Sequence, residues 1–166
     1  MSKNGKKMDD IKKIIEKAKN IKEFSLNYFE RLKRIFKSIN ENELVKFEKN
    51  LLEARSKGKT IFVFGNGGSA STATTMANDL GFDIIKKTKT KKSFKFFCIN
   101  DNSSVLTAIA NDVGYDNVFI NQLKIHYKKG DIAIILSASG NSKNLINAAK
   151  WIKNKKGKVL SIVGFE

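Results

Sequence analysis

Residues 131–165, DIAIILSASGNSKNLINAAKWIKNKKGKVLSIVGF, contain the pattern that decides the fold. A continuous apolar run at 132–136 is followed by a polar turn, a helix-like stretch from 143 and a second apolar run at 159–163. Strands that are apolar on both faces are typical of parallel sheets covered by helices on both sides, and the helix between them supplies the right-handed crossover. This stretch therefore predicts one β-α-β unit.

The same unit recurs earlier in the chain. TIFVFGNGGSA (60–70) leads into a helix-like stretch, and FKFFCIND (94–101) leads into SSVLTAIAND (103–112). NVFINQLKIHYKKG (117–130) adds a further helix, and we expect the lysine-rich segment 83–93 to be a polar connecting loop. These units predict an α/β fold: a three-layer sandwich of the flavodoxin or Rossmann kind, in which helices flank a parallel sheet, preceded by an N-terminal helical segment.

The first third of the chain is predicted to be helical. Apolar residues recur at helical spacing over 11–18, 24–39 and 44–54, with a break near Asn20. These stripes carry more apolar surface than a helical hairpin on one small sheet needs. Two interpretations stay open: part of this surface meets another subunit, or all of it folds back onto the chain's own sheet.

We therefore predict that the chain is one structural unit overall and that it consists of two segments. Residues 1–57 form the N-terminal helices, which we expect to serve oligomerisation, and residues 58–166 form the α/β domain. The length of 166 residues suits one compact domain of this kind.

The composition is strongly basic. Lys and Arg number 32 against 16 Asp and Glu, a formal net charge of +16, and arginine occurs only at positions 31, 34 and 55. Such a charge favours phosphate-rich partners in general. However, the lysines are spread over every predicted helix instead of forming one stripe, so they are typical of solvated faces, and we do not expect nucleic acid as a partner.

A single cysteine, Cys98, lies in an apolar run and is predicted to be a buried, unreactive thiol. The first ten residues, MSKNGKKMDD, are not followed by the apolar core of a secretion signal, and no apolar run has the length that spans a membrane. We therefore expect a cytoplasmic protein without a membrane partner.

Two loops rich in glycine and hydroxyl groups follow two of the predicted strands. They are GNGGSAS (65–71) and SASGNS (137–142). Because ligands of parallel sheets gather at the carboxyl ends of the strands, both loops are placed to bind one. Each serine could instead cap its helix, but one cap accounts for only one serine. Several hydroxyl groups without a lysine inside either loop predict a cradle for a small phosphate monoester, bound by neutral donors and helix dipoles.

Two other phosphate motifs fit less well. Gly65, Gly67 and Ala70 formally satisfy the dinucleotide fingerprint, but the acidic residue expected about 20 positions later would be Asp83, which no strand presents. That motif also leaves the second serine loop unexplained. The loop that binds nucleoside triphosphates is excluded, since no G-x-x-x-x-G-K-[ST] pattern occurs.

The segments GNGGSAS, ANDL, LTAIANDVGYDNVF and 130–165 together resemble the sugar isomerase (SIS) domain family, and more narrowly its phosphoheptose isomerase branch. The resemblance covers nearly the whole chain. It implies conversion of sedoheptulose 7-phosphate to a heptose 7-phosphate for surface polysaccharide, without a cofactor. It also implies that the substrate and its phosphate contact residues of the two loops and one aspartate of the segment between them: Asn66, Gly67, Gly68, Ser69, Asp112, Ser137, Ser139, Asn141 and Ser142.

The same resemblance assigns the catalytic base. Relatives place a glutamate on the helix after the first loop, where this chain has Asp79, one methylene shorter. A carboxylate there would remove a proton next to the carbonyl and form an enediol. The alternative for Asp79 is a solvated or helix-supporting carboxylate. Some relatives have a metal-binding histidine one turn earlier, where this chain has Thr75, so we expect no metal site.

Other expectations concern assembly and the end of the chain. The resemblance implies a homo-oligomer, a tetramer built through the N-terminal helices. It also places an acid histidine on a last helix that the sequence up to Glu166 lacks, while His126, the only histidine, lies elsewhere and is interpreted as a structural or surface residue. The alternative function is a non-catalytic SIS module that binds a sugar phosphate or another protein, like the relatives that bind a replication initiator.

Overall fold

The computed structural model describes residues 11–164, and their internal contacts divide them into two units, 11–46 and 47–164. The division falls inside helix α3 (Glu41–Ser56), earlier than the boundary that we predicted after residue 57. The physical reason is the apolar face of the second half of α3, where Ala54 is buried and Phe47 and Leu51 pack on the core of the α/β unit. The two units are described separately below.

The first unit is helical, as predicted. Residues 11–17 form a helix, and α2 (Ile21–Lys37) follows after a break at which Asn20 caps the new helix. The Asn20 side chain accepts a hydrogen bond from the Glu23 N–H at 2.9 Å, which satisfies one of the free donors of the first turn. No residue of α2 is buried, and Phe29 and Phe36 are 66% and 69% exposed.

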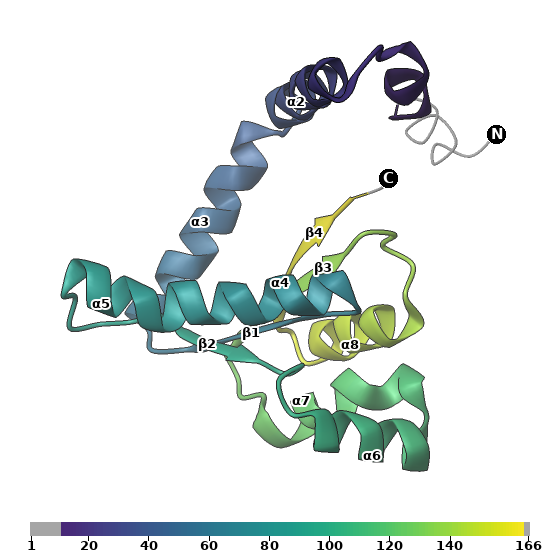
Figure 1. Cartoon of the computed structure of the whole chain (residues 1–166). Coiled ribbons are helices and arrows are strands. Elements are labelled where there is room, and N and C mark those ends of the chain that lie inside the picture. Colours follow the sequence, from purple (N-terminus) through teal and green to yellow (C-terminus); the bar gives the residue numbers. More distant parts are fainter. Residues whose placement is uncertain (1–10, 165–166) are drawn as a thin grey trace. The chain divides into compact units, whose positions relative to one another are not determined.

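The second unit is built on a four-stranded sheet. Its strands are β1 (Thr60–Gly65), β2 (Lys95–Cys98), β3 (Ile132–Ser137) and β4 (Lys158–Val163). They are all parallel and stand in the order β2-β1-β3-β4 (Figure 1). The central strands β1 and β3 are buried except at Thr60, whereas the edge strands are partly exposed, so burial on both faces holds only at the centre of the sheet.

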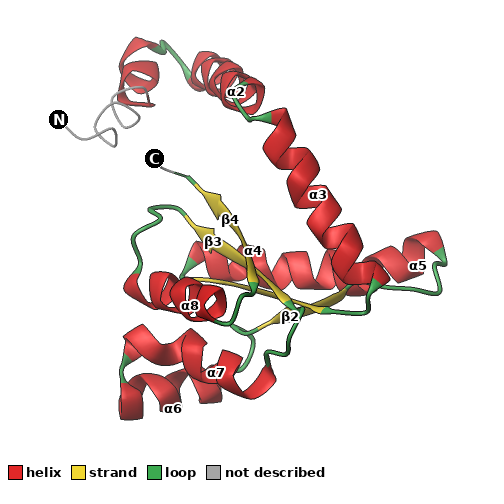
Figure 2. Cartoon of the chain, turned by 180° about the vertical axis from the view of Figure 1, so that it is seen from behind, coloured by secondary structure: helices red, strands yellow, loops and turns green. Residues whose placement is uncertain are grey.

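Helices cover both faces of this sheet, which confirms the predicted three-layer α/β fold (Figures 1 and 2). On one face lie the end of α3 and a continuous helical stretch; on the other lie α6, α7 and α8. The stretch consists of α4 (Gly68–Ala77), the π-helical turn η1 (Asn78–Asp83) and α5 (Ile84–Thr88). The opposite layer consists of α6 (Ser103–Val113), the short 3-10 turn η2 (Tyr115–Asn117), α7 (Val118–His126) and α8 (Lys143–Asn154).

The side chains of β1 show how the core divides. Phe62 and Phe64 point to the α6–α8 layer, while Ile61 and Val63 point to the α3–α4 layer. Successive side chains of a strand point to opposite faces, so an uninterrupted apolar run requires a helix layer on each side.

The segment 83–93 is only partly the loop that we predicted, because α5 continues the helix to Thr88. Asp83 and Lys87 form an ion pair of 3.0 Å one turn apart on this helix, and the chain leaves it at Lys89 in the left-handed conformation. Lysine is a good helix former, so a lysine-rich stretch does not by itself indicate a loop.

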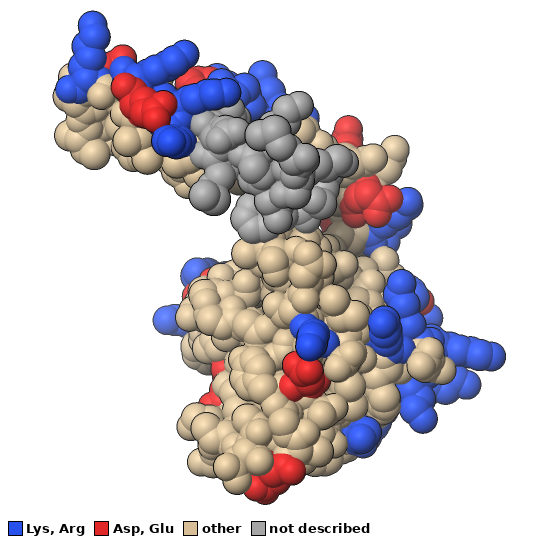
Figure 3. Space-filling model, turned by 90° about the vertical axis from the view of Figure 1, so that its right-hand side faces the viewer, with Lys and Arg blue, Asp and Glu red and all other residues tan. Residues whose placement is uncertain are grey.

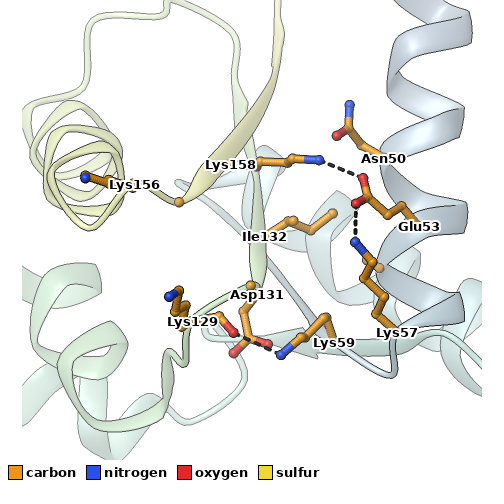
Figure 4. A pocket seen from close by; sticks show the side chains of 12 residues that line it. Asn50, Glu53, Lys57, Lys59, Lys129, Asp131, Ile132, Lys156 and Lys158 are labelled. Carbon is orange, nitrogen blue, oxygen red and sulfur yellow. Dashed lines mark hydrogen bonds and ion pairs between the residues drawn. The ribbon is translucent and has the colours of Figure 1, made fainter.

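A lysine-rich hollow of about 380 Å³ lies at the amino ends of β3 and β4, beside the end of α3 (Figure 4). The Glu53 carboxylate forms ion pairs with the Lys57 Nζ at 2.6 Å and the Lys158 Nζ at 2.7 Å. Both lysine side chains point at it in Figure 4. These lysines lower the pKa of Glu53 to about 2. The Lys158–Glu53 pair therefore ties α3 to the edge strand β4.

We predict that Glu53→Gln lowers the urea midpoint of unfolding at pH 7. The folded pKa of Glu53 is about 2, below the ordinary value of 4.5, so its stabilisation is complete above pH 4.5 and disappears as the pH falls through 2. The difference in urea midpoint between the variant and the unmodified protein should therefore become smaller as the pH falls from 4.5 to 2. Urea unfolding monitored by circular dichroism measures it.

The control is Glu48→Gln, which changes an exposed glutamate of the same helix that forms no ion pair within residues 11–164. A midpoint difference for Glu53→Gln that stays constant from pH 7 to pH 2 would contradict the assignment of this stabilisation to the ion pairs.

Candidate functional site

The candidate site lies where the strand order reverses. From β1 the chain passes to α4 on one face of the sheet, and from β3 it passes to α8 on the other face. β1 and β3 are neighbours, with Gly65 paired to Leu136 at their carboxyl ends. The loops that leave these strands therefore diverge, at the position known as the switch-point crevice of open α/β sheets, where ligands bind.

Gly65 allows the two strand ends to come this close. A Cβ atom at Gly65 would lie 2.6 Å from the Leu136 carbonyl oxygen and 2.7 Å from the Ser69 Cβ. Asn100, after β2, holds the Gly65 backbone on its other side: its side chain accepts from the Gly65 N–H at 3.1 Å and donates to the Gly65 carbonyl at 2.9 Å. The first loop therefore starts from a backbone position that is held on both sides.

The second loop is organised by its own serines. The Ser137 hydroxyl accepts a hydrogen bond from the Gly140 N–H at 3.0 Å, and the Ser139 hydroxyl accepts one from the Asn141 N–H at 3.2 Å. Gly140 has a φ of +69°, which glycine adopts without strain. The two serines therefore shape a tight turn above the end of β3.

The hydroxyl of Ser142 does not cap α8, although Ser142 is the N-cap residue. Its carbonyl accepts from the N–H groups of Leu145 and Ile146, whereas its hydroxyl, like that of Ser69, forms no hydrogen bond within residues 11–164. Helix capping thus does not account for these two serines. Their hydroxyl groups are left for a ligand or water.

A pair of side chains joins the first loop to the first turn of α8, which follows the second loop. The Asn66 amide nitrogen donates to the Asn144 Oδ1 at 2.9 Å, and the Asn144 amide nitrogen donates to the Asn66 Oδ1 at 3.0 Å. The Tyr115 hydroxyl also hydrogen-bonds the Asn66 Oδ1, at 3.0 Å. Sequence reasoning missed Asn144, Tyr115 and Asn100. The signal available in the sequence was the spacing of Asn144, which stands four and eight residues before the apolar positions Ala148 and Ile152 of the predicted helix.

The two loops are electrostatically suited to an anion although neither contains a lysine or arginine. The N-termini of α4 and α8 both begin in these loops, and the first N–H groups of a helix have no partner inside the helix. The side on which α4 begins faces the viewer in Figure 3, and few charged side chains occur on that part of the α/β unit. Helix dipoles and neutral donors of this kind bind phosphate groups.

The structure brings most of the predicted site residues to this edge but not the two aspartates. The residues of both loops follow the paired carboxyl ends of β1 and β3: Asn66, Gly67, Gly68, Ser69, Ser137, Ser139, Asn141 and Ser142. Asp112 is exposed near the end of α6, three residues before Tyr115. Asp79 is exposed in the π-helical turn η1, ten residues beyond Ser69, which is about 15 Å along a helix.

Other reactive groups lie outside the crevice. Cys98 is buried, as predicted, and this burial raises the pKa of its thiol. His126 is exposed at the end of α7, with its ring centroid 5.3 Å from that of Phe97. Within residues 11–164 no three His, Cys, Asp or Glu side chains are grouped as metal ligands would be. None of the helices in that range is long and apolar enough to cross a membrane.

Comparisons with known proteins agree with this arrangement. A family profile of the SIS domain matches residues 27–164. The chain is 40% identical over 153 residues to the phosphoheptose isomerase of Sulfurimonas denitrificans, covering 88% of this chain and 74% of that protein. It is 36% identical over 149 residues to the phosphoheptose isomerase of Aliarcobacter butzleri, covering 89% and 76%. The solved structure of phosphoheptose isomerase GmhA from Neisseria gonorrhoeae has a TM-score of 0.73 at 28% identity, covering 87% of this chain and 75% of that one.

We predict that Gly65→Ala lowers the free energy of unfolding by about 1–3 kcal/mol, because the new methyl group overlaps the Leu136 carbonyl. Gly68→Ala is the matched control, since a Cβ there meets nothing within 4 Å. Urea unfolding of both variants checks the prediction. Equal stability of the two variants would show that the strand ends can separate without cost.

Proposed function

The chain belongs to the SIS domain family, and we propose from its likeness to phosphoheptose isomerases that it interconverts sedoheptulose 7-phosphate and a heptose 7-phosphate. The observation that carries this proposal is the pair of serine loops joined at the switch point of the sheet. Two serine hydroxyls of these loops, those of Ser69 and Ser142, have no protein partner among residues 11–164. We also propose that the protein acts in the cytoplasm.

In this proposal the phosphate binds to Ser69, Ser137, Ser139 and Ser142, together with the backbone of the first loop. Neutral donors and helix N-termini support this assignment, because they stabilise a phosphate dianion without competing cations. Asn66 and Asp112 would contact the sugar. The reaction needs a carboxylate that removes a proton from the carbon beside the carbonyl, after which an acid returns a proton to the neighbouring carbon of the enediol.

We propose Asp79 as that carboxylate. Asp79 lies in a π-helical turn, an irregularity that is frequent at functional sites, and is exposed to solvent. Its carboxylate accepts a hydrogen bond from the Asn78 amide at 3.1 Å and forms no ion pair within residues 11–164. It therefore remains available as a base.

We predict that Asp79→Asn lowers kcat for isomerisation by roughly 10²–10⁴-fold while sedoheptulose 7-phosphate still binds. An amide keeps the shape of the side chain but cannot take up the proton. Formation of aldoheptose phosphate measures turnover, and calorimetry measures binding.

The control for this change is Asp83→Asn, which removes another carboxylate of η1, one that is paired with Lys87. The kcat of that variant should stay close to the value of the unmodified protein. If the unmodified protein binds the sugar phosphate without converting it, the non-catalytic SIS module becomes the better description, and Asp79→Asn should then have no effect on binding.

We further propose that each site is completed by a second copy of the chain, within a homo-oligomer that we expect to be a tetramer. Asp79 is exposed about 15 Å along the helix from Ser69, which supports a site that takes its serine loops from one chain and its carboxylate from another. The helical segment supplies a candidate contact surface, because Phe29 and Phe36 are more than half exposed within their own unit.

We predict that two inactive variants restore activity when they are mixed. A Ser139→Ala/Ser142→Ala double variant and Asp79→Asn, unfolded and refolded together, should give about a quarter of the unmodified activity if each site takes loop and carboxylate from different chains. Light scattering should report an oligomer for each protein. If mixed oligomers form but show no activity, the shared site is contradicted. Each active site would then be built from a single chain.

A further inference from the structure

The amide network of the site starts from a group whose role as donor is fixed. The backbone N–H of Leu145 donates to the Asn144 Oδ1 at 2.9 Å, and a peptide N–H cannot accept a hydrogen bond. Asn144 is only 2% exposed, so its side chain has few alternative partners. The orientation of the Asn144 amide therefore follows from the backbone of α8.

The orientation of the Asn144 amide determines the orientation of the Asn66 amide. Because Asn144 presents its oxygen and one N–H to Asn66, the reciprocal pair forms only when Asn66 presents its own N–H and oxygen in return. The Asn66 oxygen, which already accepts from Asn144, must then accept from the Tyr115 hydroxyl at 3.0 Å. The oxygen is thus occupied by two donors. One N–H of Asn66 remains without a partner within residues 11–164.

We propose that Asn144 and Tyr115 are positioning residues that hold Asn66 as a hydrogen-bond donor toward the substrate. The proposal rests on the proposed function of the same site. The free N–H of Asn66 lies in the first loop, beside Gly67 at the N-terminus of α4. It recognises an oxygen atom of the sugar phosphate that accepts a hydrogen bond. A flipped amide would instead present an oxygen, which repels such an atom, so a donor fixed before binding avoids that reorganisation.

We predict that Asn144→Ala weakens binding of sedoheptulose 7-phosphate by about tenfold or more, and that Tyr115→Phe weakens it by roughly two- to tenfold. Both changes are neutral in charge, and each removes one donor from the Asn66 oxygen. Tyr115 is 57% exposed, so its variant should fold even if Asn144→Ala does not. Calorimetry measures affinity, and circular dichroism checks the fold.

The decisive measurement repeats both changes in an Asn66→Ala background. If Asn144 and Tyr115 act through Asn66, neither change should weaken binding further there, because the group that they position is absent. Loss of affinity by the same factor in both backgrounds would mean a general structural role and would overturn the proposal. Unchanged affinity of the variants in the unmodified background would overturn it as well.

Nuclear magnetic resonance of the free protein separates this proposal from the proposed function. The two side-chain N–H signals of Asn66 should differ in exchange with water, one protected by Asn144 and one open, and Asn144→Ala should remove the difference. Equal exchange of both protons in the unmodified protein would overturn the positioning role. If sedoheptulose 7-phosphate is neither bound nor converted, the isomerase proposal fails, and these signals alone decide the orientation of Asn66.

Discussion

The close parallel pairing of β1 with β3 is the constraint on which the rest of the α/β unit depends. It places Gly65 against Leu136 with no room for a side chain between the strand ends. Because the chain leaves these two strands toward opposite faces of the sheet, the same pairing creates both the three layers and the crevice between the loops. Fold and candidate site therefore have one physical origin.

The chemistry of the crevice follows from how its polar groups are satisfied. The hydroxyl oxygens of Ser137 and Ser139 accept hydrogen bonds from backbone N–H groups of the turn. The Asn66 Oδ1 accepts one hydrogen bond from Asn144 and one from Tyr115. What remains toward the ligand is a set of donors: the O–H groups of the four serines, one amide N–H and the free N–H groups of two helix N-termini. Such a surface selects an anion or another acceptor although it contains no lysine or arginine.

The charged interactions that hold the unit together are found at the opposite edge. Glu53 joins α3 to β4 at the amino ends of the strands, through lysines that lower its pKa to about 2. The strongly basic composition therefore contributes to structure at one edge of the sheet, while the loops at the other edge stay nearly free of charge (Figures 3 and 4).

The sequence by itself determined the fold class, the two serine loops and their place at the strand ends, because apolar runs, helical spacing and glycine-rich turns are local patterns. It did not reveal that the helix after the first loop continues through 84–88, since lysines suit helix and loop alike. Only the tertiary structure decided the strand order, the closeness of Gly65 to Leu136 and the amide pair of Asn66 with Asn144. Those contacts join residues far apart in the chain, and a hydrogen bond between two such side chains leaves no periodic trace in the sequence.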